Sequence, residues 1–106
     1  MLDLPPEQLA EIRRILSEHL PECEARAFGS RVRGTAREYS DLDLAIVCDN
    51  KIPERLMEEL RDVFADSGLP IRVDLLDWNS ISESFRRVIE GRYEVVREAA
   101  GFKARI

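Results

Sequence analysis

The sequence is poor in the residues that build zinc sites and disulfide frameworks. Its 106 residues include two cysteines, Cys23 and Cys48, and one histidine, His19. The cysteines are distant from each other in sequence and have no histidine neighbours, so reduced thiols are expected rather than a metal site or a disulfide framework. His19 has no serine, cysteine or second histidine at an interpretable spacing, and we assign it no role.

Long apolar runs and an excess of positive charge are also missing. The longest apolar runs are too short to span a bilayer and the N-terminus lacks a signal-peptide pattern, so a cytoplasmic protein is expected. The formal net charge of −5 argues against a nucleic-acid-binding surface, where a basic footprint is expected. It does not argue against a nucleotide, because bound cations can screen a triphosphate from carboxylates.

Length and composition fit one small domain. Hydrophobic residues make up 44% of the chain, so disorder is not expected. A chain of this size buries roughly 60–70% of the surface that it exposes when unfolded. No repeat, low-complexity segment or linker divides the sequence, which predicts a single domain over residues 1–106.

Helices and strands are predicted to alternate along the chain. Apolar periodicity and its flanking Pro, Gly and capping signals predict three longer helices, from Pro5-Pro6 to Pro21, from Pro53 to Gly68, and from a Ser80-x-x-Glu83 capping box to Gly91. Shorter apolar segments predict strands at Glu24 to Phe28, Leu42 to Val47, Arg72 to Leu76 and Tyr93 to Val96. The pattern predicts an α/β (α+β) fold in which a small sheet is backed by helices.

One segment combines a turn suited to phosphate with a pair of acidic residues. Gly29-Ser30 stands ten residues upstream of Asp41-Leu42-Asp43. In a β-strand Asp41 and Asp43 would project to the same side, at the mouth of the strand, where they could share divalent cations. Glycine lets the backbone approach an anion, and a helix beginning after Ser30 could turn its free N–H groups toward it. The segment therefore predicts a metal site beside a phosphate cradle.

Several of these residues also have an ordinary structural explanation. Asp41 and Asp43 alone could cap a loop and keep a strand end solvated, but the spacing from the Gly-Ser pair favours function. Arg31 and Arg33 could be solvated side chains, and Arg33 is the stronger candidate for a role. Trp78 could stack on a base, although an aromatic residue at the edge of the core is the commoner explanation.

The residues Gly29, Ser30, Arg33, Gly34, Asp41 and Asp43 resemble the motif of the nucleotidyltransferase superfamily that includes DNA polymerase beta. The resemblance is closest to the minimal nucleotidyltransferases, small prokaryotic proteins often paired with helical HEPN-family proteins in toxin–antitoxin systems. The family has a third carboxylate on a later strand, and Asp74 fits that position better than Asp77. The resemblance implies a mixed sheet in which the helix after the Gly-Ser pair connects the first two strands.

The resemblance also implies a reaction and residue roles. The protein would be an enzyme that transfers AMP from ATP to a hydroxyl, with Mg²⁺ or Mn²⁺ as cofactor, because oxygen ligands suit those ions. Asp41, Asp43 and Asp74 would be catalytic and would bind the metal, and Asp74 would also serve the acceptor hydroxyl. Gly29, Ser30 and Arg33 would bind the nucleotide through its β- or γ-phosphate.

These 106 residues have no room for the extra domain with which larger superfamily members bind their acceptor. The leading hypothesis is therefore an antitoxin that adenylylates a tyrosine of a HEPN-family toxin, without direct contact to nucleic acid or membrane. Two alternatives stay open. The protein could be a non-catalytic antitoxin that neutralises a toxin by contact alone, or a homodimer that modifies a small molecule.

Overall fold

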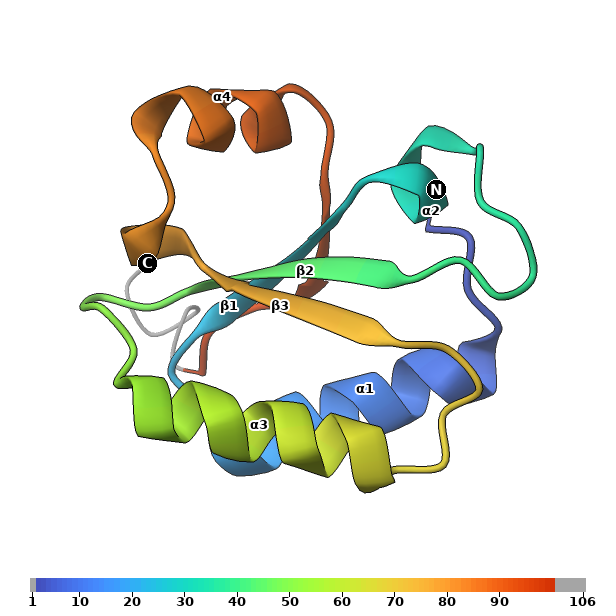
Figure 1. Ribbon diagram of the computed structural model, residues 1–106, viewed down its shortest axis with the longest axis horizontal. Coiled ribbons are helices and arrows are strands. Elements are labelled where there is room, and N and C mark those ends of the chain that lie inside the picture. The colour runs from blue at the N-terminus through green and yellow to red at the C-terminus, as the bar shows by residue number, and fades with distance from the viewer. Residues whose placement is uncertain (1, 101–106) are drawn as a thin grey trace.

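A four-stranded sheet with helices on both faces forms the body of the protein (Figure 1). The computed structural model describes residues 2–100. In chain order the elements are α1 (Pro6–His19), β1 (Glu24–Phe28), α2 (Ser30–Arg33), β2 (Leu42–Val47), α3 (Glu54–Asp66), β3 (Val73–Asp77), the 3₁₀ helix η1 (Trp78–Ser80), α4 (Glu83–Gly91) and β4 (Glu94–Arg97). The predicted single domain over residues 1–106 stays a prediction, since residues 1 and 101–106 lie outside the described part.

The sheet is mixed, as the family resemblance implied. The strand order is β3-β2-β1-β4. β1 is antiparallel to both β2 and β4, whereas β2 and β3 are parallel. The short helix α2 connects β1 to β2, so the Gly-Ser turn lies at the same end of the sheet as the beginning of β2.

Burial separates the two faces of the sheet. On one face, alternate residues of β1 and β2 pack against α1 and α3, which lie side by side below the sheet in Figure 1. These strand residues are almost fully buried: Ala25, Ala27, Leu42, Leu44 and Ile46. Side chains of a strand alternate between faces, so Asp43 and its partner Asp74 on β3 project from the opposite face. The hydrophobic core thus fixes which side of the sheet carries the carboxylates.

The predicted elements agree with the structure except at the start of α4. The strands β1 and β2 have the predicted bounds, and β3 and β4 begin one residue later than predicted. Ser82 caps α4 by accepting a hydrogen bond from the Phe85 N–H at 3.1 Å, so the predicted capping box at Ser80 is wrong. Ser80 belongs to η1 and donates its hydroxyl to Asp77 at 3.1 Å.

The expectation of reduced thiols is also wrong. Cys23 and Cys48 form a disulfide, with their Cα atoms 4.6 Å apart. The antiparallel register pairs Glu24 with Val47, so the next residues outward, Cys23 and Cys48, face each other. Their separation of 25 residues in the sequence hides a proximity that only strand pairing creates.

No helix within residues 2–100 is both long enough and apolar enough to cross a bilayer.

Candidate active site

Gly29 joins β1 to α2 in a conformation that few other residues adopt. Its φ angle is +82°, a region that side chains other than hydrogen disfavour. An ideal Cβ atom at this position would lie 2.4 Å from Oδ2 of Asp43. The carbonyl of Gly29 accepts hydrogen bonds from the N–H groups of Val32 and Arg33, each at 3.0 Å. Glycine is therefore needed both for the turn and for the close approach of the Asp43 carboxylate.

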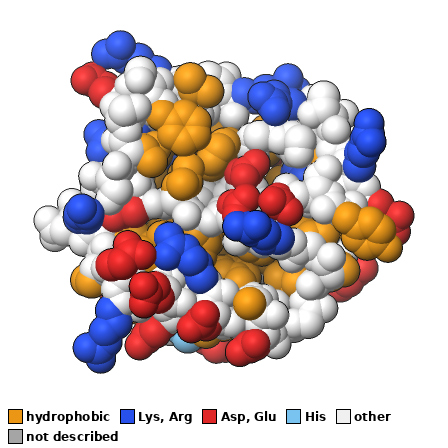
Figure 2. Space-filling view, viewed as in Figure 1, with side chains coloured by type: hydrophobic (Ala, Val, Ile, Leu, Met, Phe, Trp, Pro, Cys, Tyr) orange, Lys and Arg blue, Asp and Glu red, His pale blue; other side chains and the backbone are white. Residues whose placement is uncertain are grey.

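The predicted carboxylates come together at one end of the sheet. Asp43 and Asp74 are direct partners in the β2–β3 ladder, and Asp41 is exposed just before β2. Burial raises the pKa of Asp43, the charges of Asp74 and Asp41 raise it further, and the nearby Arg33 guanidinium lowers it. Figure 2 shows one group of acidic side chains near the middle of this face and others along its lower part. This concentration of negative charge favours cation binding.

Asp77, the alternative third carboxylate, lies on the other face of the sheet. It is 7% exposed. Its oxygens accept hydrogen bonds from the N–H groups of Ile52 and Asn79 and from the Ser80 hydroxyl. These contacts give Asp77 a structural role and leave Asp74 as the better candidate beside Asp43.

The chemistry of the carboxylate cluster fits a hard divalent cation. Asp41, Asp43 and Asp74 offer only oxygen donors, which suit Mg²⁺ or Mn²⁺, and the lack of a side chain at Gly29 lets the Asp43 carboxylate lie against the backbone of the turn. Within residues 2–100, no three His, Cys, Asp or Glu side chains are arranged as a metal site. Asp74 instead pairs with Arg72, whose Nε lies 3.1 Å from its Oδ1.

A pocket of about 250 Å³ opens beside Asp43. Arg33 and Asp43 line one side of it, and residues of α4 form the other. The rings of Phe28 and Phe85 meet edge to face across it, with their centroids 5.9 Å apart. From the sequence we did not predict that α4 lines this pocket. Its apolar stripe could have indicated this, because the stripe includes Val88, which is 69% exposed and therefore not part of the core. The pocket combines a charged side with an apolar wall, as a nucleotide requires.

Arg31 is neither solvated nor directed at the pocket. It is 4% exposed, and its guanidinium donates to the backbone carbonyls of Asp3, Arg37, Glu38 and Ser40. Three of these carbonyls belong to the segment between α2 and β2, which leads to Asp41. Arg31 therefore holds in place the loop that sets the spacing between the Gly-Ser turn and the acidic pair.

We expect Arg31→Lys to lower the free energy of unfolding by about 2 kcal/mol, because an ammonium group cannot satisfy all four of these carbonyls from the buried Arg31 position. Urea unfolding followed by circular dichroism measures the change. Arg33→Lys is the matched control, since Arg33 is an exposed side chain of the same helix, and it should stay within about 0.5 kcal/mol of wild type. Equal stability of the two variants would contradict the anchoring role.

Trp78 is covered by arginine side chains. The guanidinium of Arg26 lies 4.9 Å from the Trp78 ring centroid and 4.7 Å from that of Tyr93, and Arg86 lies 5.6 Å from Trp78. Contacts of this kind stabilise an aromatic residue at the edge of a core. The structure thus supports the commoner explanation of Trp78 over base stacking.

The chain is similar in sequence and in structure to known proteins. The family model described as "Nucleotidyltransferase domain" matches residues 9–96. The chain is 45% identical over 97 residues to the probable protein adenylyltransferase MntA of Haemophilus influenzae, covering 92% of this chain and 85% of that protein. It superposes on a crystal structure of a toxin–antitoxin complex with AMP-PNP with a TM-score of 0.74 and 25% identity, covering 87% of this chain and 74% of that chain.

A second solved structure shares the fold. It contains a tri-AMPylated HEPN toxin of Shewanella oneidensis in complex with its MNT antitoxin, and the matching chain gives a TM-score of 0.68 at 22% identity. The match covers 88% of this chain and 71% of that chain.

Proposed function

Because the chain belongs to the nucleotidyltransferase domain family, we propose that it transfers AMP from ATP to a hydroxyl of a HEPN-family toxin and thereby acts as an antitoxin. The observation that carries the proposal is the pairing of Asp43 with Asp74 beside the Gly29 turn. The similar proteins whose names describe protein adenylylation and a HEPN toxin complex support the choice of acceptor.

The nucleotide would occupy the pocket between α2 and α4. Its phosphates would lie against the backbone of Gly29 and Ser30, where glycine permits close approach, and Arg33 would neutralise part of their charge. The apolar wall formed by Phe28, Phe85 and Val88 would contact the nucleoside. Asp41, Asp43 and Asp74 would hold Mg²⁺ or Mn²⁺, which would stabilise the charge that develops on the phosphates.

Transfer would proceed by displacement at the α-phosphorus of ATP. The acceptor oxygen forms a bond to this phosphorus, and the bond from the phosphorus to the bridging oxygen breaks, so that pyrophosphate leaves with the electron pair. Asp74 would take the proton of the acceptor hydroxyl, because it belongs to the edge strand β3 and is half-exposed. AMP joined through a phosphodiester would add negative charge and bulk to the acceptor surface.

We expect ATP to bind at least about tenfold more tightly in the presence of Mg²⁺ than in its absence, because three carboxylates otherwise repel the triphosphate. Isothermal titration with and without Mg²⁺ measures the two affinities. Asp41→Asn/Asp43→Asn should remove most of the difference, since it removes two of the charges that Mg²⁺ would screen. Equal affinity for wild type in both conditions would argue against a shared metal.

Intact-mass spectrometry tests the proposed transfer directly. A HEPN-family toxin is incubated with this protein, ATP and Mg²⁺, and its mass should rise by one or more AMP units. Omission of either ATP or this protein should leave the mass unchanged. A toxin that is silenced without any gain in mass would establish the contact-only alternative instead.

A further inference from the structure

The outer edge of β3 is open beside Asp74. In the sheet formed by residues 2–100, β3 is an outermost strand. The Leu42 N–H donates to the carbonyl of Arg72 at 2.9 Å, which directs the backbone groups of Arg72 and Asp74 toward β2. In a parallel ladder alternate residues bond to alternate sides, so the N–H and C=O groups of Val73 and Leu75 point outward. Such an edge is a template for an added strand.

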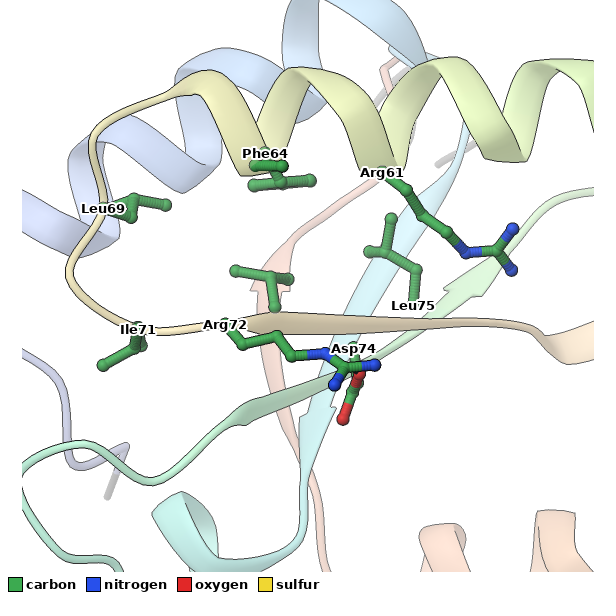
Figure 3. Close-up of a pocket in the computed structure, with 9 residues that line it drawn as sticks. Arg61, Phe64, Leu69, Ile71, Arg72, Asp74 and Leu75 are labelled. Carbon is green, nitrogen blue, oxygen red and sulfur yellow. The ribbon is translucent and has the colours of Figure 1, made fainter.

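A pocket of about 520 Å³ adjoins this edge. It lies between β3, the C-terminal half of α3 and the segment that joins them (Figure 3). Phe64, Leu69 and Leu75 give it an apolar lining. Two arginines stand around it, with Arg61 reaching from α3 toward β3 and Arg72 lying over Asp74 (Figure 3). The pocket is therefore apolar inside and basic at its rim.

We propose that this edge and pocket bind the part of the acceptor protein that carries the modified hydroxyl, as an extended segment with apolar and acidic side chains around that hydroxyl. The inference rests on the proposed AMP transfer. On a strand added to β3, the residue opposite Asp74 projects to the same face, with the two Cβ atoms about 5 Å apart. The adjacent residues project to the other face, toward Phe64 and Leu75. One binding mode thus brings a hydroxyl to Asp74 and an apolar anchor to the pocket.

The positive charge of Arg61 and Arg72 favours an acidic segment of a partner over a second copy of this chain. Arg72 is 76% exposed and Arg61 is 46% exposed at the side chain. Each pairs with a carboxylate of the chain itself, Asp74 and Glu54, at 3.1 Å, so a partner's carboxylates would share these exposed guanidinium groups. The chain as a whole carries a net charge of −5, so an acidic segment would be attracted to this basic rim and repelled elsewhere. A second copy of the chain paired through the same edge would bring its own Arg61 and Arg72 to the same site, where like charges repel.

Two blocked peptides serve as probes. The first is acetyl-Glu-Thr-Val-Tyr-Val-Thr-Glu-amide with a fluorescent label, in which valines and glutamates at odd spacings from the tyrosine share the face of the pocket and Arg61, and in the second each glutamate is replaced by lysine. Fluorescence anisotropy without ATP should show that wild type binds the acidic peptide at least about tenfold more tightly than the lysine peptide. N-methylation of one alternate set of backbone amides in the acidic peptide should abolish binding, and methylation of the other set should not, because only one set faces β3.

Arg61→Glu is the test variant, and it should reverse the preference between the two peptides. Arg87→Glu is the matched control, since Arg87 is also an exposed helix arginine paired with a glutamate about 3 Å away; it should bind like wild type. Affinity for ATP should stay unchanged in both variants, because neither arginine lines the nucleotide pocket.

Three results would overturn the inference: equal binding of the two peptides by wild type, identical behaviour of Arg61→Glu and Arg87→Glu, or a homodimer in analytical ultracentrifugation whose association depends on Arg61. Peptide binding is measured without ATP. If the peptide does not bind, the proposed AMP transfer to the toxin can still be correct. If AMP transfer is absent, the peptide measurements still report whether the edge of β3 binds an acidic segment.

Discussion

Replacing Asp41 and Asp43 together by asparagine should lower the rate of AMP transfer at least about 1000-fold, because the change removes the charges that would hold the metal and stabilise the transition state. The rate of pyrophosphate release in the presence of the toxin and Mg²⁺ measures the loss. Asp62→Asn/Asp66→Asn is the matched control, since it removes two exposed carboxylates from α3 and should transfer AMP at the wild-type rate. Full activity of the Asp41/Asp43 variant would exclude these residues from catalysis.

The same variant should melt at a higher temperature than wild type at neutral pH in the absence of metal. The pKa of Asp43 is raised above its ordinary value of 3.8 by burial and by Asp74 and Asp41, so ionisation of Asp43 opposes folding above its folded-state pKa. As the pH falls through the folded-state pKa toward 3.8, wild type gains relative stability and the difference should close. Melting curves over this pH range measure it. A difference that grows on acidification would contradict the assigned repulsion.

The second large effect is expected for Gly29→Ala, which should lower AMP transfer about 100-fold by displacing the Asp43 carboxylate. The new methyl group would lie 2.4 Å from Oδ2 of Asp43, so the carboxylate has to move. The left-handed backbone at Gly29 should also cost about 1–2 kcal/mol of stability. Steady-state kinetics and urea unfolding of the same preparation measure the two effects separately.

Gly68→Ala is the control that separates the effect of backbone strain from the effect of contact with the Asp43 carboxylate. Gly68 also has a φ angle of +82°, but its ideal Cβ position has no atom within 4 Å apart from those of its two chain neighbours. Its substitution should therefore cost similar stability and leave AMP transfer unchanged. If Gly68→Ala lost as much activity as Gly29→Ala, general destabilisation would explain both.

The local parts of the site could be predicted because they follow from short stretches of sequence. The apolar run from Leu42 to Val47 predicted β2, and the alternation of side chains along a strand placed Asp43 on one face. The Gly-Ser pair predicted a helix just after Ser30, and α2 begins at Ser30 itself. The choice of Asp74 over Asp77 agrees with the burial of Asp77 and its three hydrogen bonds, although the catalytic roles themselves stay predictions.

Features that depend on distant pairing could not be predicted from one sequence. The Cys23–Cys48 disulfide needs the antiparallel register of β1 and β2. The buried position of Arg31 depends on the backbone carbonyl of Asp3, 28 residues away, and on nearer carbonyls that only the folded loop turns toward it. The wall that α4 contributes to the pocket depends on how that helix docks over Phe28. In each case the determining contacts join residues whose proximity has no local signature.

The disulfide constrains one part of the proposed site and leaves another part outside the covalent ring. It closes a covalent ring from Cys23 to Cys48, and Gly29, Ser30, Arg33, Asp41 and Asp43 all lie within that ring, whereas Asp74 lies outside it. In the chain-entropy description, a ring of this size reduces the freedom of the unfolded chain by about 3–4 kcal/mol. The residues proposed for the phosphates and for two of the metal ligands remain tethered to one another even when the chain unfolds. Asp74 joins them only through the β2–β3 ladder, so the acceptor side of the site exists only while the sheet is intact.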